Sequence, residues 1–214
     1  MTAANFDRLA RIYAALERLA FGGALERARF RFLDELRDRK NILVLGEGDG
    51  RCLARLVHLA PHARIQCVDA SAAMLATAAQ RLRGNVHPAA VQFTQADARQ
   101  LALPTDEFDA IVTLFFLDCF TAAEAGGLLA KLSLAARRDC LWLYADFALP
   151  AEGWRRWRAR LWLDVLYFFF RRVTRISARA LPEIPAMMID RGWHHIAHDE
   201  WQAGLLRSDV WSRV

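Results

Sequence analysis

The sequence predicts an α/β fold with a doubly wound, mostly parallel sheet, and three observations support this. Short apolar runs alternate with stretches of helical periodicity between residues 41 and 145. The first run, Asn41–Leu45, ends in a glycine-rich turn, which is typical of a buried parallel strand that enters a helix. The chain has 214 residues, which suffice for one domain with a full core. Alternating strands and helices imply right-handed crossovers, so helices should cover both faces of the sheet.

Periodicity and turn residues place the remaining elements. Apolar side chains recur at helical spacing over residues 6–36, and Gly22–Gly23 should divide this stretch into two helices. Further strands are predicted at 64–68, 91–94, 108–114 and 141–145, and helices at 51–60, 71–82 and 121–135. The tail should hold an arginine-rich helix at 154–176, a short helix at 182–190, and final strands at 193–197 and 205–211.

The whole chain, residues 1–214, is predicted to form a single domain, because no repeat, linker or low-complexity segment interrupts it. Within it we expect N-terminal helices at 1–40, a cofactor-binding core at 41–150, and the arginine-rich helix with the final strands at 151–214.

Composition narrows the class of protein. Hydrophobic residues make up 55% of the chain, which excludes a disordered protein. The formal net charge is +5, and the cations are almost all arginines. This excess permits an anionic partner such as RNA or a lipid headgroup, but an arginine bias can equally reflect genome composition.

Cysteine and histidine patterns give no sign of a metal site. The four cysteines form no C-x-x-C pair and lie in apolar contexts, so buried free thiols are favoured over disulfides: Cys52, Cys67, Cys119 and Cys140. His194 and His195 are adjacent, and neighbouring side chains on a strand point to opposite faces. We therefore expect no metal.

The sequence also predicts where the protein resides. Residues Met1–Leu9 are polar, which does not suit a secretory leader. The longest apolar run, Leu161–Phe170, is interrupted by Asp164 and is far shorter than the roughly 20 residues that span a bilayer. We expect a cytoplasmic protein, with contact at a membrane surface left open.

The turn after the first strand has the pattern G-x-G-x-G at residues 46–50. Glycines there allow unusual dihedral angles and close approach of a nucleotide cofactor to the backbone. A dinucleotide site would require a third glycine three residues after Gly48, where this chain has Arg51. This departure disfavours a nicotinamide cofactor, whereas a sulfonium cofactor without phosphates does not need that glycine.

Two acidic residues follow the next strands. Asp69 ends the second strand, 21 residues after Gly48, where a carboxylate can accept hydrogen bonds from both ribose hydroxyls. The alternative is a helix cap, because Asp69 and Ser71 are both good capping residues. Asp97 follows the third strand and can accept from an adenine amino group, although a solvated turn explains it equally well.

Together these elements resemble class I S-adenosylmethionine-dependent methyltransferases over roughly residues 41–150. The stretches 68–75, 95–98, 103–104 and 108–112 are similar to that family's motifs in order and spacing. The resemblance implies a Rossmann-like seven-stranded sheet with an antiparallel C-terminal edge strand and S-adenosyl-L-methionine as cofactor. It implies cofactor contacts from Gly46, Glu47, Gly48, Gly50, Asp69, Ala70, Met74, Asp97, Ala98 and Leu114.

The N-terminal segment 6–13 resembles the quinone-methylating, small-molecule branch of the family, in which a helix closes over the cofactor. That likeness implies an N-terminal helical lid with Tyr13 in it. One departure concerns Val44, where many members carry an acid, and Glu47 is the candidate to compensate for it. The motif after the fourth strand is not Asn-Pro-Pro-aromatic, which disfavours methylation of DNA bases.

Candidate catalytic residues are Asp118, Asp146 and Tyr13. Methyl transfer from a sulfonium depends mainly on holding the nucleophile in line, so a general base is required only for some acceptors. The two aspartates should lie at the carboxyl ends of the fourth and fifth strands, where they can position the acceptor or take its proton. Helix caps or turn acids are the alternatives, and Phe115 and Phe116 are favoured as core residues.

These inferences predict an S-adenosylmethionine-dependent methyltransferase that acts on a small, hydrophobic acceptor of the quinone, polyketide or lipid class. The segment 154–176 could roof the acceptor pocket, lie on an anionic membrane surface, bind RNA, or form a buried helix. An RNA methyltransferase and a noncatalytic cofactor-binding protein stay open as alternatives, while a nicotinamide dehydrogenase is disfavoured.

Overall fold

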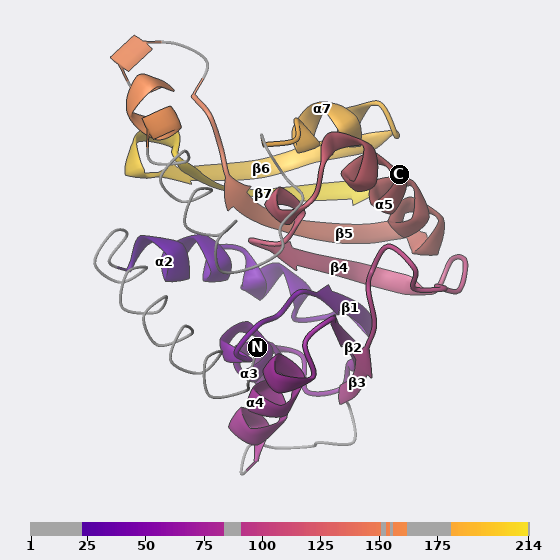
Figure 1. Ribbon diagram of the computed structural model, residues 1–214. Coiled ribbons are helices and arrows are strands. Elements are labelled where there is room, and N and C mark those ends of the chain that lie inside the picture. The colour runs from indigo at the N-terminus through magenta and orange to yellow at the C-terminus, as the bar shows by residue number, and fades with distance from the viewer. Residues whose placement is uncertain (1–22, 84–90, 151–152, 155, 162–180, 214) are drawn as a thin grey trace.

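The computed structural model describes residues 23–83, 91–150, 153–154, 156–161 and 181–213 (Figure 1). The predicted N-terminal lid with Tyr13 lies outside these residues, and so does most of the predicted arginine-rich helix 154–176. Within the described residues, no helix is long and apolar enough to cross a membrane.

Seven strands form one sheet in the order β3-β2-β1-β4-β5-β7-β6. Their bounds are β1 Asn41–Leu45, β2 Arg64–Asp69, β3 Val91–Gln95, β4 Phe108–Leu114, β5 Ala136–Phe147, β6 Trp193–Trp201 and β7 Leu206–Arg213. The pairs among β1 to β5 are parallel, and β7 pairs antiparallel with both β5 and β6. The predicted doubly wound, mostly parallel sheet with an antiparallel C-terminal strand is confirmed. The antiparallel strand β7 lies one place in from the edge, which β6 forms.

The described helices connect these strands. They are α2 Ala24–Phe30, α3 Arg51–Leu59, α4 Ala72–Leu82, α5 Ala122–Ala135 and α7 Ile184–Ile189, with short 3-10 turns η1 Leu33–Leu36, η3 Leu117–Cys119 and η4 Gln202–Gly204. Their starts follow from the sequence. Ser71 caps α4, and Thr121 forms a reciprocal capping box with Glu124 at the start of α5.

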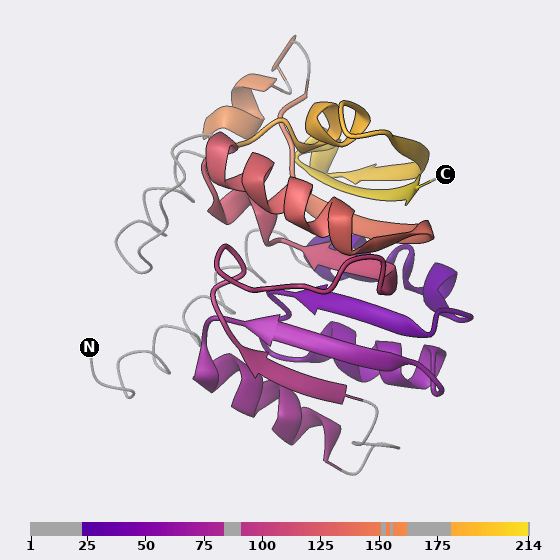
Figure 2. The same cartoon turned by 90° about the vertical axis from the view of Figure 1, so that its right-hand side faces the viewer.

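The two faces of the sheet bury alternate residues of each strand. On β1, Ile42 and Val44 pack in one core with η1, α3 and α4. Leu43 and Leu45 pack in the other core with α5 and α7. Figure 2 shows the strands one above another, with helix α5 in front of the upper part of the sheet. Because β1 is buried on both faces, its side chains form the continuous apolar run that marks a parallel strand in the sequence.

Three strands are longer than predicted, because pairing continues through polar residues. β5 begins directly after α5, with Ala136 paired to Phe108 before an irregularity in the ladder. On β6, pairing with β7 extends to Trp201, and on β7 it extends to Arg213. Charged side chains interrupt the apolar runs in these segments, so the runs alone did not predict the full length of the strands.

Candidate functional site

The candidate site lies where β1, β2, β4 and β5 end. In the parallel register, Leu45 lies beside Val68 and Thr113, so the glycine turn after β1 lies next to the ends of β2 and β4. Leu114 in turn pairs with Ala145 on β5. Carboxyl ends of parallel strands are where ligands bind in sheets of this kind.

The three glycines of the turn have different surroundings, although all have positive φ. A Cβ on Gly50 would lie 2.6 Å from the Cα of Ala78, so this glycine permits close packing of α3 on α4. A Cβ on Gly46 would lie 2.2 Å from the Phe116 ring, which therefore rests on the turn. A Cβ on Gly48 would meet no atom of the described residues within 4 Å. Gly48 is thus the glycine at which a ligand has room to approach the backbone.

Asp69 joins the end of β2 to the glycine turn. Its carboxylate accepts from the backbone N–H of Gly48 at 3.4 Å and of Ser71 at 2.8 Å. The capping role falls to Ser71, whose Oγ accepts from the N–H of Met74 at 3.3 Å. Burial raises the pKa of Asp69 above its ordinary value, against the lowering effect of these backbone hydrogen bonds. The carboxylate is therefore fixed beside the open backbone of Gly48.

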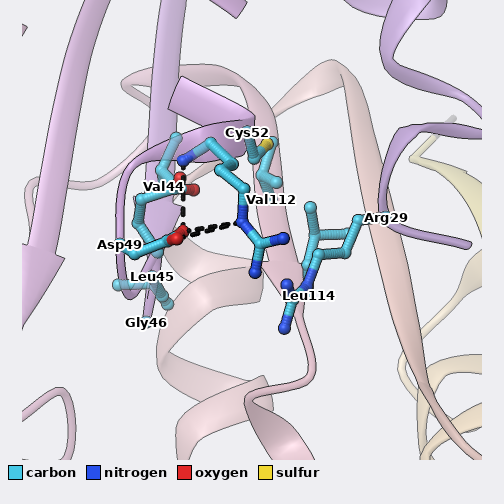
Figure 3. Close-up of a pocket in the computed structure, with 10 residues that line it drawn as sticks. Arg29, Val44, Leu45, Gly46, Asp49, Cys52, Val112 and Leu114 are labelled. Atoms are coloured by element: carbon cyan, nitrogen blue, oxygen red, sulfur yellow. Dashed lines mark hydrogen bonds and ion pairs between the residues drawn. The ribbon is translucent and has the colours of Figure 1, made fainter. Parts of the chain in front are cut away.

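Beside the turn is a small pocket between α2, α3 and the ends of β1 and β4 (Figure 3). Its lining residues are Arg29, Val44, Leu45, Gly46, Glu47, Asp49, Arg51, Cys52, Val112 and Leu114. The dashed lines in Figure 3 are the bonds of Asp49 with Arg51, on the far side of the pocket from Arg29. The pocket thus combines acidic and basic groups.

Glu47 and Arg29 bring opposite charges into this pocket. The Glu47 carboxylate accepts from the N–H of Leu53 at 3.0 Å, at the start of α3. Burial raises the pKa of Glu47 from 4.5 to about 7, although that hydrogen bond and the charge of Arg29 oppose the shift. The Arg29 guanidinium lies 5.2 Å from the centre of the Phe115 ring. Reasoning from the sequence missed Arg29 and favoured Phe116 as a core residue, because their positions beside the site depend on how α2 and η3 pack.

Asp97 is half-buried and already bound by an arginine. Its carboxylate accepts from Arg99 Nε at 3.0 Å and from an Arg99 terminal nitrogen at 2.6 Å. Arg99 also donates to Glu124 at 2.7 Å. The Arg99 guanidinium lowers the pKa of Asp97. Its neighbour Ala98 is buried.

Asp118 and Asp146 lie together, 28 residues apart in the chain. The Asp118 N–H donates to Asp146 Oδ2 at 3.0 Å, the Phe147 N–H donates to Oδ1 at 3.0 Å, and the two carboxyl groups hydrogen-bond each other. Burial raises the pKa of both, and the neighbouring charge of Asp118 raises that of Asp146 further. Two carboxyls in this contact favour sharing a proton.

The aromatic residues around this pair pack on one another. Phe115 has a φ of +55° and meets Phe147 edge-on at 5.5 Å between ring centres. Phe116 meets Phe120 edge-on at 5.0 Å. Phe115 and Phe116 therefore pack as core-type residues, and both border the site.

Among the cysteines, Cys52 lines the pocket and Cys119 lies beside Asp118. All four cysteines are free thiols, three of them buried and Cys119 partly exposed. Over the described ranges, no cluster of three or more metal-binding side chains is found. His195 Nε2 lies 2.9 Å from Oδ1 of Asp209.

Comparison with known proteins identifies the family. Residues 42–138 match the model of a methyltransferase domain. These residues therefore carry a methyltransferase domain. A sequence search finds no match among curated proteins.

Solved methyltransferases share the fold of this chain at low sequence identity. The mitomycin 7-O-methyltransferase MmcR is 14% identical with a TM-score of 0.68, over 98% of this chain and 60% of its own. The 1,6-didemethyltoxoflavin-N1-methyltransferase of Burkholderia thailandensis, solved with that compound and S-adenosylhomocysteine, is 16% identical with a TM-score of 0.67, over 99% and 87%.

A third structure, an O-methyltransferase family 2 protein of Planctomyces limnophilus in complex with apigenin, is 16% identical with a TM-score of 0.70, over 94% of this chain and 62% of its own. The present chain thus spans about three fifths of the length of two of these three proteins. The predicted family and fold are confirmed. The predicted cofactor, S-adenosylmethionine, is consistent with this family and this fold.

Proposed function

We propose that this methyltransferase uses S-adenosyl-L-methionine to methylate a small, hydrophobic acceptor of the quinone, polyketide or lipid class. The observation that carries the proposal is the bond between Asp69 and the backbone of Gly48, the glycine with open space before it. A carboxylate fixed beside an unobstructed backbone suits a ribose whose two hydroxyls both donate.

The nucleoside end of the cofactor fits the residues around Asp69. Ala70 and Met74 follow Asp69 at the start of α4, where an apolar side chain can pack on adenine. The adenine amino group would share the Asp97 carboxylate with Arg99, and Ala98 would border the ring. A carboxylate has about four acceptor positions, so Arg99 does not exhaust it.

The charged side chains that line the pocket suit the methionine end of the cofactor. That end carries an ammonium and a carboxylate, and Glu47 and Arg29 offer the opposite charge to each. Glu47 thereby supplies the acid that is absent at Val44. Gly46 and Leu114 line the same pocket and would contact the chain between the two charges.

The carboxyl pair fits the acceptor end. The cofactor supplies an activated methyl group on a sulfonium, so the protein has to hold the acceptor in line and receive its proton. A new bond joins the acceptor atom to the methyl carbon, the carbon–sulfur bond breaks, and its electron pair stays on sulfur. The acceptor's proton passes to the Asp118–Asp146 pair, whose raised pKa values suit proton uptake. Tyr13 stays a prediction, outside the described residues.

The acceptor class rests on the apolar surroundings of this end. Phe115, Phe116, Phe120 and Phe147 lie around the ends of β4 and β5 and leave few polar groups beside the carboxyl pair. Proteins of the same fold are named for, or were solved with, small molecules: mitomycin, 1,6-didemethyltoxoflavin and apigenin.

A noncatalytic cofactor-binding protein is the second candidate, and Phe116 is the observation that favours it. Its ring rests on Gly46, next to the position proposed for the methionine end. If the ring does not move, the cofactor would be held away from the acceptor.

The first test is cofactor binding by thermal shift. S-adenosylhomocysteine should raise the melting temperature and NAD should not, because a ligand that binds the folded state stabilises it. The shift should vanish in Asp69→Ala and persist in the matched control Asp139→Ala, an exposed acid on β5. A shift with NAD alone would overturn the cofactor assignment.

The second test is methyl transfer from labelled S-adenosylmethionine into a host-cell lysate, which is then separated into organic-soluble, aqueous, RNA and protein fractions. Label in the organic fraction that is lost in Asp69→Ala is the expected result. Label in RNA would show that the acceptor is RNA and not a small hydrophobic molecule. Cofactor binding without any methyl transfer would favour the noncatalytic candidate.

A further inference from the structure

A short helical segment after β5 docks on the domain by one side. It comprises the described residues 153–154 and 156–161. Ala159 is 1% exposed and packs in a core cluster with Leu205 and Leu206. Arg158 donates to the backbone carbonyl of Gln202. Figure 1 shows this orange segment beside the yellow connection between β6 and β7.

The opposite side of the segment is apolar and open to solvent. Trp154 is 65% exposed, Trp157 is 70% exposed and Leu161 is 52% exposed. Their spacing of three and seven residues from Trp154 places them on one face of a helix. We call these three residues the tryptophan face. Large exposed apolar patches of this kind usually mark a site of interaction.

The charge around the tryptophan face is uniformly positive. Residues 153–161 contain four arginines and no acid. Arg156 and Arg160 are exposed on one flank, and on the other flank the Arg158 guanidinium lies 5.5 Å from the centre of the Trp154 ring. A partner that binds the tryptophan face must therefore have an apolar interior that takes up these side chains, and it must carry negative charge at its surface.

A second copy of the chain does not fit these requirements. Two tryptophans and a leucine expose on the order of 400 Å², about half of what each partner buries in a stable interface. A two-fold pair would also bring the arginines of one copy against those of the other. An RNA strand would gain from stacked rings, but Leu161 offers it no stacking surface.

We propose that the tryptophan face binds the surface of a membrane rich in anionic lipids. Trp154, Trp157 and Leu161 insert at the level of the headgroups, while Arg156 and Arg160 pair with lipid phosphates. The helix then lies in the interface and does not span it. The proposal does not depend on methyl transfer, although it would bring the end of β5, near Asp146, towards the phase in which a hydrophobic acceptor dissolves.

The test is flotation with vesicles of phosphatidylcholine alone and of equal parts phosphatidylcholine and phosphatidylglycerol. We expect binding to the anionic vesicles that weakens with salt. Trp157→Ser should weaken it roughly tenfold or more, because a large apolar side chain leaves the interface. Arg156→Gln with Arg160→Gln should weaken binding to anionic vesicles and reduce its salt dependence.

The matched control is Ile189→Ser, which removes another exposed apolar side chain, 62% exposed on α7, and should leave vesicle binding unchanged. Each variant should keep the thermal shift with S-adenosylhomocysteine, which separates loss of binding from loss of folding. Equal binding by wild type and Trp157→Ser would overturn the proposal. So would absence of vesicle binding, binding to RNA alone, or a concentration-dependent dimer that Trp157→Ser abolishes.

Discussion

The two halves of the sheet hold their acidic side chains in different ways. Around β1 and β2, carboxylates are held by backbone N–H groups of nearby turns. Asp69 accepts from Gly48 and Ser71, and Glu47 accepts from Leu53 six residues ahead. The bonds to Ser71 and Leu53 follow from the local path of the chain, whereas the bond to Gly48 also requires that β1 and β2 lie side by side.

On the other half, acidic side chains also depend on partners from other segments of the chain. Asp209 is fully buried on β7 and accepts from two Arg207 nitrogens at 2.7 Å, with His195 of β6 at 2.9 Å from one of its oxygens. Asp146 on β5 meets Asp118 in the turn after β4. The bonds from Arg207 lie within β7, but the contacts of Asp209 with His195 and of Asp146 with Asp118 exist only once the strands have assembled in register.

Short motifs therefore specify the half of the site that we propose for the cofactor. The assembled sheet specifies the half that we propose for the acceptor. A binding site whose donors are backbone groups can be preserved by a few glycines and one acid. A site built from buried carboxyls requires that every neighbouring strand be in place, because an unpaired buried charge is costly.

The largest effect should come from breaking the buried ion pair on β7. Asp209→Ala leaves Arg207 and His195 without their common partner and should cost about 3–5 kcal/mol of folding free energy. The matched control, Asp199→Ala, breaks an exposed pair with Arg31 and should cost about 1 kcal/mol or less. Urea unfolding of the two variants measures the difference, and equal losses would contradict the contrast between buried and exposed pairs.

Next in size are substitutions at two glycines of the same turn. Gly50→Ala would press a Cβ against the backbone of Ala78 and should cost about 2–4 kcal/mol in urea unfolding. Gly48→Ala meets open space and should cost about 1 kcal/mol, the strain of its positive φ. Gly48→Ala should nevertheless weaken binding of S-adenosylhomocysteine in calorimetry. Full binding by that variant would place the cofactor elsewhere.

A smaller effect is expected from pH at Glu47, whose pKa is about 7. A carboxyl with a raised pKa in the fold favours folding at low pH, and that contribution is lost as pH rises from about 4.5 to about 7. Ionised Glu47 attracts the cofactor's ammonium, so S-adenosylhomocysteine should bind about three- to tenfold more tightly at pH 8 than at pH 6. Glu47→Gln should remove this dependence in calorimetry, and an unchanged dependence would assign it to another group.

The smallest effect concerns the carboxyl pair. Because the pKa of Asp146 is raised, its contribution to stability falls as pH rises above the ordinary carboxyl range. Asp118→Asn removes a neighbouring charge and should reduce the loss of stability between pH 5 and pH 8 by about 1 kcal/mol. Urea unfolding at both values checks this, with Asp106→Asn as the exposed control. An unchanged slope would show that the two groups do not share a proton.

The sequence by itself determined the local features of this protein. The buried run 41–45, the glycine turn, Asp69 and the caps at Ser71 and Thr121 all follow from dihedral preferences and hydrogen bonds within a few residues. The alternation of such elements was sufficient to predict the doubly wound sheet, because crossovers between parallel strands have one hand.

Only the tertiary structure decided how distant segments meet. It placed β7 between β5 and β6, set Phe116 on Gly46, brought Arg29 into the pocket with Glu47 and joined Asp118 to Asp146. No residue type or spacing predicts these contacts, because each contact depends on the register of several strands and on the packing of the helices between them. Local rules therefore specify the elements, and long-range packing specifies which side chains share a site.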